Sequence, residues 1–102
     1  MNDELSDLPE VLEAWWEREQ IVALFNDLHE GATVSHVQVR ATKAGTRDKP
    51  ADGAVTLRDA YDLFLAGDAA AIQIHYEFSG TRWCDTLMPA SHLTRIIRTR
   101  MP

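Results

Sequence analysis

The feature that most constrains the fold is a strict alternation of apolar and polar residues at positions 70–88, broken by one glycine. Ile72, Ile74 and Tyr76 alternate with polar residues, which is the period of a strand with one buried face. Glycine favours the positive φ that two-residue hairpin turns require. The stretch therefore predicts a β-hairpin, with either Ser79-Gly80 in a type I′ turn or Gly80-Thr81 in a type II′ turn.

The choice of turn decides which side chains meet across the hairpin. A turn at residues 79–80 makes three cross-strand pairs: Tyr76 with Trp83, His75 with Cys84, and Glu77 with Arg82. We favour this turn, because it pairs opposite charges and two aromatic rings. We then expect the apolar face to be buried as one unit, comprising Ile74, Tyr76, Trp83 and Leu87.

Asp85 is the exception on this apolar face, where an unpaired carboxylate is unfavourable. If residues 88–92 form a five-residue loop, Leu87 lies opposite Leu93 and Asp85 lies opposite Arg95. The sequence therefore predicts an Asp85–Arg95 ion pair between two strands. The functional alternative is a carboxylate that serves a binding pocket, because ionisable groups in apolar surroundings also mark functional sites.

A long N-terminal helix is predicted at residues 8–31, with Ser6 or Asp7 as its cap and Gly31 as its stop. At about 100° per residue, its apolar stripe moves by more than a right angle between residues 8–15 and residues 21–28. Three explanations remain open: a break near residues 17–20, a helix covered on two sides by its own domain, or a helix shared with a second subunit. The interface candidates are Trp15, Trp16, Leu24, Phe25 and Leu28.

The rest of the chain completes one domain over residues 1–102, with a frayed start at 1–7. Residues 32–41 alternate like a strand, and residues 43–55 are expected to be a mobile loop. A capping box at Thr56 starts a short helix that Gly67 ends. The predicted order is α-β-α-β-β-β, an α+β domain with about four mostly antiparallel strands. The order of the strands within the sheet stays open.

The charge and cysteine content exclude several classes of function. The net charge is −6, and residues 1–30 hold nine acidic residues against one arginine. An acidic chain repels the phosphate backbone, so nucleic-acid binding is not expected. No apolar run is long enough to span a bilayer, and the acidic start does not resemble a signal peptide. The single cysteine favours a reducing compartment, so we expect a cytoplasmic protein.

The chemical motifs are weak. Cys84 opposite His75 is compatible with a thiolate–imidazolium pair, but the sequence shows no third orienting group and no oxyanion donors. The four histidines have no spacing typical of metal ligands. We therefore predict no catalytic residues, no metal and no cofactor. The candidates for a pocket are Asp85, Arg95, Tyr76, His75 and Cys84.

These patterns favour a small, non-enzymatic interaction or adaptor protein that binds a protein partner or a second copy of itself. The alternative is a small-molecule-binding or enzymatic domain with a pocket between helix and sheet. A deep pocket with convergent polar groups favours the alternative, whereas a large apolar patch favours interaction.

Overall fold

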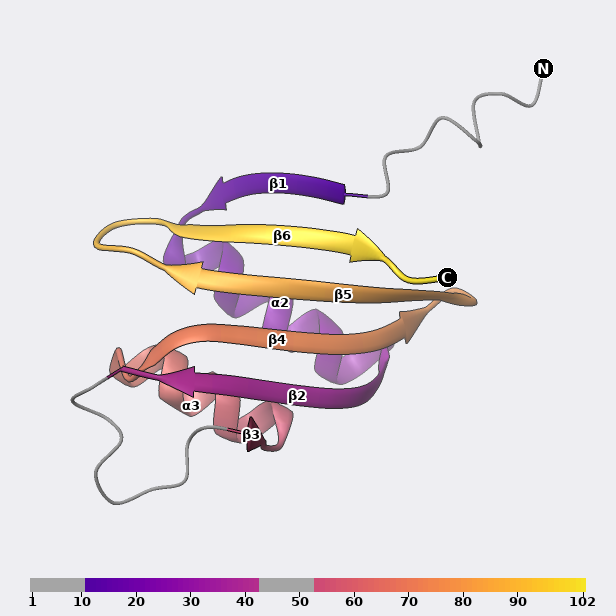
Figure 1. Cartoon of the computed structure of the whole chain (residues 1–102), viewed down its shortest axis with the longest axis horizontal. Coiled ribbons are helices and arrows are strands. Elements are labelled where there is room, and N and C mark those ends of the chain that lie inside the picture. The colour runs from indigo at the N-terminus through magenta and orange to yellow at the C-terminus, as the bar shows by residue number, and fades with distance from the viewer. Residues whose placement is uncertain (1–10, 43–52) are drawn as a thin grey trace.

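The computed structural model describes residues 11–42 and 53–102, which form a six-stranded antiparallel sheet with two helices (Figure 1). The elements in chain order are β1 (Val11–Trp16), α2 (Arg18–Gly31), β2 (Thr33–Ala41), β3 (Gly53–Ala54), α3 (Leu57–Ala66), β4 (Ala69–Phe78), β5 (Thr81–Pro89) and β6 (Thr94–Arg100). The strand order is β1-β6-β5-β4-β2-β3. Both helices lie behind the sheet in Figure 1, so the predicted α+β class is confirmed.

The central hairpin has the predicted register. Tyr76 pairs with Trp83, and His75 pairs with Cys84. Ser79 has a φ of 53° and Gly80 a φ of 80°. Positive φ at both positions is the signature of a type I′ turn, so the type II′ alternative is excluded.

The N-terminal helix expected at residues 8–31 is wrong in its first half. Residues 11–16 form strand β1, which pairs along the edge of β6, and the helix begins at Arg18. The expected break is present, but it separates a strand from a helix. The backbone N–H of Glu17 donates to the Gln20 side chain at 2.8 Å, which caps the new helix start. Because β6 presents an unpaired edge, the apolar residues of this segment are used in a ladder rather than a helix.

The strand predicted at residues 32–41 is confirmed as β2, and it contains a register shift between Val34 and His36. Val34 is three residues before Val37, so regular alternation would place the two on opposite faces. The register shift lets Val34 pack against the same core as the buried pair Val37 and Val39. β2 pairs antiparallel with β4, which settles its place in the sheet.

The short helix after Thr56 is confirmed as α3, with its capping box, and Gly67 ends it at a φ of 78°. The loop expected at 43–55 is partly wrong, because Gly53–Ala54 forms β3 against β2. The rest of that segment, and the frayed start expected at residues 1–7, lie outside the described residues.

The core lies between the helices and the sheet. α2 contributes a single stripe of buried residues: Ile21, Leu24, Phe25 and Leu28. The sheet contributes Val37, Val39, Ile72, Ile74, Leu87 and Ile96. Ile74, Tyr76 and Leu87 are buried together as expected, whereas Trp83 is only partly buried.

Two glycines are expected to respond to alanine with opposite signs. Gly80 has open space around it but a positive φ, so Gly80→Ala should lower the free energy of unfolding by about 1–2 kcal/mol. Gly31 is the last residue of α2, and its φ is not positive. A Cβ added there would lie 3.8 Å from the Phe78 ring, an ordinary van der Waals distance. Gly31→Ala should therefore raise the free energy of unfolding by about 0.5–1 kcal/mol. Urea denaturation of both variants checks this pair, and equal effects would contradict the assigned turn.

Candidate functional site

A buried ion-pair network lies on the helix side of the sheet. Asp85 is completely buried, and Arg98 on β6 donates to it through Nε at 2.9 Å and Nη2 at 2.8 Å. The Tyr76 hydroxyl lies 3.1 Å from each carboxylate oxygen. The carboxylate thus has both a countercharge and hydrogen-bond donors, which a buried charge needs.

The predicted partner of Asp85 is therefore wrong. The loop is shorter than expected, with Pro89 opposite Thr94, and Leu87 pairs with Ile96 rather than Leu93. The register differs from the predicted one by three residues, which is an odd number. Every side chain of β6 therefore lies on the face opposite to the predicted one. Arg95 consequently points away from the helices and forms a salt bridge with Glu13 on β1.

The network changes the protonation behaviour of its members. Burial and then the charge of Asp85 raise the pKa of Tyr76, so its hydroxyl stays protonated and available as a donor. The hydrogen bond with Asp85 raises the pKa of Arg98. The site therefore holds a neutral phenol and a fixed guanidinium side by side.

A pocket of about 530 Å³ opens beside this network, between the second half of α2 and the sheet. Its apolar lining consists of Leu12, Leu24, Leu28, Ala32, Phe78 and Trp83. Its polar lining consists of Asp27, Tyr76, Thr81, Arg98 and Arg100. We call this the helix-side pocket.

The other pocket candidates lie on the opposite face of the sheet. The Cys84 sulfur is 3.7 Å from His75 Nε2, so the predicted juxtaposition is confirmed. Burial, the main cause, raises the pKa of the Cys84 thiol, which opposes thiolate formation. The His36 ring lies edge-on to His75, with centroids 5.7 Å apart. In the described part of the chain, no group of three or more His, Cys, Asp or Glu is arranged to hold a metal ion.

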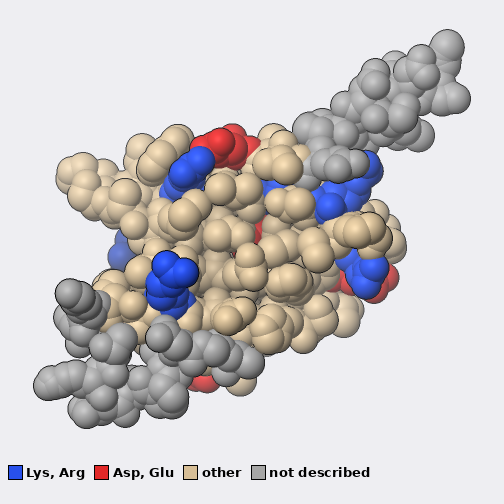
Figure 2. All heavy atoms as spheres, viewed as in Figure 1, with Lys and Arg blue, Asp and Glu red and all other residues tan. Residues whose placement is uncertain are grey.

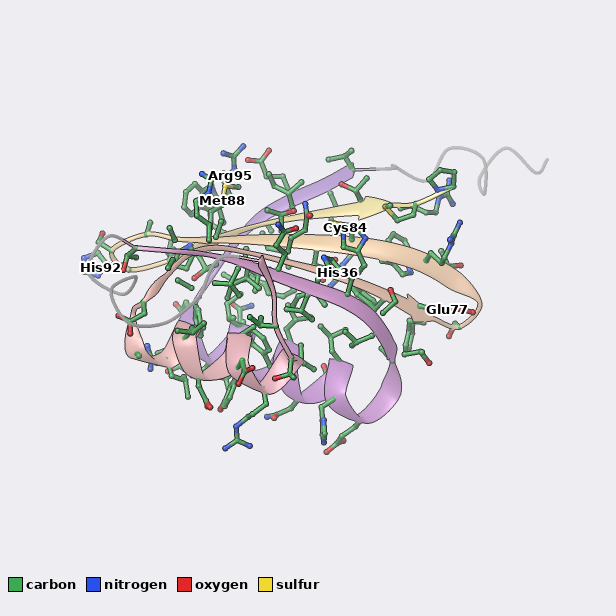
Figure 3. All side chains as sticks on the ribbon, turned by 60° about the horizontal axis from the view of Figure 1, so that its bottom comes forward. His36, Glu77, Cys84, Met88, His92 and Arg95 are labelled. Atoms are coloured by element: carbon green, nitrogen blue, oxygen red, sulfur yellow. The ribbon has the colours of Figure 1, made fainter. Side chains whose placement is uncertain are left out.

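No described helix covers this opposite side, which we call the open face. Alternation along the strands places on it Val11, Glu13, Trp15, His36, Gln38, Arg40, Ala71, Gln73, His75, Glu77, Arg82, Cys84, Thr86, Met88, Arg95, Ile97 and Thr99. Figure 2 views the molecule from this side, and the middle of the face consists mostly of residues without charge. In Figure 3, Met88 and Arg95 project from the sheet on the side away from the helices.

The interface candidates separate into two groups. Leu24, Phe25 and Leu28 are buried in the core of their own chain, so their side chains are not exposed to a partner. Trp15 is 55% exposed on the open face. Trp16 faces the opposite way and packs against the core, because successive residues of a strand point to opposite faces.

Arg98, Arg100 and Ile97 are site residues that were not predicted from the sequence. The face on which each of these side chains lies depends on the register of β6. That register follows from the loop at residues 90–93, which has four residues rather than the predicted five. The exposure of Leu93, at 38%, is consistent with its place in the loop rather than opposite Leu87. The adjacent pair Ile96 and Ile97 made the period of this strand ambiguous, because either isoleucine suits the buried face.

Comparison with known proteins found no match: no family model matches the chain, and neither does any curated protein or solved structure. None of the helices in residues 11–42 and 53–102 has the length and apolar character needed to cross a membrane.

Proposed function

We propose that this protein is a non-enzymatic interaction module, and that its open face associates with the open face of a second copy. The observation that carries this proposal is a sheet face whose middle has almost no charged side chains (Figure 2). A face that stays in water normally carries many charges, whereas the centres of interfaces are depleted of them.

The apolar side chains of the open face gather on β1, β6 and β5. Val11 and Trp15 are 57% and 55% exposed, and Ile97 and Met88 lie partly exposed on the neighbouring strands. Trp and Met are enriched in interfaces, and aromatic residues often anchor them. This group therefore supplies the apolar part of the proposed contact.

The charges favour a second copy over contact through the helices. The exposed acids of the helix layer are Glu17, Glu19, Asp27, Glu30, Asp59 and Asp62. Arg18 and Arg58 are the only arginines in the two helices, which contain no lysine, so two helix layers would repel each other. The charges of the open face are nearly balanced, with Glu13 and Glu77 against Arg40, Arg82 and Arg95. A two-fold axis can then place opposite charges together.

The geometry of a sheet also suits this contact. Two twisted sheets pack face to face about 10 Å apart with their side chains interdigitated. A domain of 102 residues has limited interior, and a two-fold dimer buries a second face without additional chain. We place the protein in the cytoplasm. The single cysteine, Cys84, is free, and a free thiol suits a reducing compartment.

Replacing Thr86 with glutamate is expected to dissociate the dimer. Thr86 lies between Gln73 and Ile97 in the cross-strand row, near the middle of the open face. Two introduced carboxylates would be desolvated close to the two-fold axis, and such repulsion should weaken the dimer roughly a hundredfold. Sedimentation equilibrium at micromolar concentration measures the change.

The matched control is Ala23→Glu, which adds the same charge at an exposed position of α2. It should leave the dissociation constant unchanged, and circular dichroism should show that both variants stay folded. A monomer mass for the unaltered protein would overturn the proposal. Dissociation by the Ala23 variant alone would move the interface to the helices.

A further inference from the structure

We infer that the helix-side pocket binds a small organic anion with an apolar body, such as an alkyl or aryl carboxylate. This binding site is separate from the open face, so it does not depend on self-association. Three features carry the inference: the size and lining of the pocket, the guanidinium groups at one of its walls, and the network that holds one of them in place.

The size and lining of the pocket suit the apolar body. Its volume of about 530 Å³ falls within the range of about 300–1,000 Å³ typical of small-molecule sites. Trp83 and Phe78 contribute aromatic surface from the sheet, and Leu24 and Leu28 contribute aliphatic surface from α2. Leu12 and Phe78 are 50% and 52% exposed, so a bound apolar body would remove a substantial apolar surface from water.

The guanidinium groups suit the anionic head. Arg98 and Arg100 are two residues apart on β6, so both point to the helix side, and both line the pocket. Arg98 uses Nε and Nη2 on Asp85, which leaves the Nη1 donors uncommitted to that carboxylate. Arg100 forms no salt bridge with any described residue. A carboxylate is the natural partner for two such forks of N–H donors.

The buried network fixes one of these donors before a ligand arrives. Asp85 is fully buried and holds Arg98 through two hydrogen bonds, while the Tyr76 hydroxyl donates to the same carboxylate. A group that is already ordered loses little conformational freedom on binding. The pocket therefore presents a rigid guanidinium, with its charge balanced by Asp85, beside an apolar wall.

Asp27 is the acidic residue that also lines the pocket, on the α2 side. It is an exposed residue, whereas Arg98 and Arg100 are both partly buried. Water screens an exposed charge more strongly than a partly buried one. Asp85 already balances the charge of Arg98, so the guanidinium of Arg100 supplies the net positive charge of this wall. Because this charge is less exposed than that of Asp27, it should set the preference, and anions should bind more tightly than cations.

The test compares three probes with one alkyl chain: decanoate, decan-1-ol and decylammonium. Heteronuclear NMR follows the indole N–H signals, because Trp83 lines the pocket while Trp15 lies on the open face. Decanoate should shift the Trp83 signal and leave the Trp15 signal in place. It should bind more tightly than decan-1-ol, and decylammonium should bind most weakly.

Two arginine variants make the test specific. Arg100→Gln should weaken decanoate about tenfold, the typical contribution of a charge-assisted hydrogen bond, and leave decan-1-ol unchanged. Arg58→Gln is the matched control and should leave decanoate binding unchanged, because Arg58 is an exposed arginine of α3 that does not line this pocket. If Arg100→Gln does not fold, Arg100→Lys supplies the test, and it should keep the preference for decanoate.

Three results would each overturn the inference. One is equal affinity for decanoate and decan-1-ol in the unaltered protein. Another is tighter binding of decylammonium, which would make Asp27 the dominant charge of the pocket. The third is a ligand-induced shift of the Trp15 signal without a shift of Trp83, which would move the binding site to the open face.

Discussion

Replacing Arg98 with methionine is expected to lower the free energy of unfolding by about 3–5 kcal/mol, the usual effect of removing one partner of a buried ion pair. The substitution leaves the carboxylate of Asp85 fully buried, with the Tyr76 hydroxyl as the only remaining side-chain donor among the described residues. Methionine keeps most of the apolar stem, so the loss comes from the uncompensated charge rather than from a cavity. Urea denaturation, followed by circular dichroism, measures the change.

The double variant Asp85→Asn with Arg98→Met removes both charges and should recover a large part of that loss, because no buried charge remains. Arg95→Met is the matched control. Arg95 forms a half-exposed salt bridge with Glu13, and such pairs contribute at most about 1 kcal/mol. If Arg95→Met and Arg98→Met have equal effects, the register of β6 is wrong.

Replacing Phe25 with alanine is expected to lower the free energy of unfolding by about 3–5 kcal/mol, as large-to-small aromatic changes in cores do. Phe25 is 3% exposed and joins the two helices. Its ring centroid lies 5.3 Å from that of Tyr61 and 6.1 Å from that of Phe64. The denaturation midpoint of the variant measures the loss.

Phe78→Ala is the control for this prediction, since it removes the same atoms from a residue that is 52% exposed. Its effect should be about 1 kcal/mol or less, because only half of the ring leaves water on folding. If Phe25→Ala changed the oligomeric state with little loss of stability, Phe25 would be an interface residue. Its burial between α2 and α3 opposes that outcome.

The β6 register shows why part of the candidate site was not predictable. The apolar and polar residues of this strand fit two alignments that differ by three positions, since Ile96 and Ile97 are both apolar. The choice depends on the length of the loop after Pro89 and on how well each alignment fills the core. One alignment brings Arg95 to Asp85, and the other brings Arg98.

The strand conformation of Trp15 and Trp16 was also not predictable, because their sequence pattern fits two structures. Their segment carries a helical apolar pattern as well as residues that suit strands. Local propensity differs by less than 1 kcal/mol per residue between these states. Pairing with the edge of β6 supplies a ladder of hydrogen bonds, and this non-local contact decides for the strand.

The central hairpin could be predicted from the sequence alone, with its turn narrowed to two alternatives. Its alternation has a period of two over both arms, and Ser79-Gly80 admits a turn that sets the pairing between them. Both signals are local, so no distant contact is needed to read them. The helix start at Thr56 is local in the same way, because a side chain three residues away caps it.

Tertiary structure alone decided the partner of Asp85, the division of candidates between two faces, and the existence of the helix-side pocket. Each depends on residues far apart in the chain, such as Asp27 on α2 and Arg100 on β6. Many pairings of such segments satisfy the same apolar pattern, and the free energy of the whole packed core selects one of them. The pattern of the chain therefore specifies its elements, while their mutual packing specifies its sites.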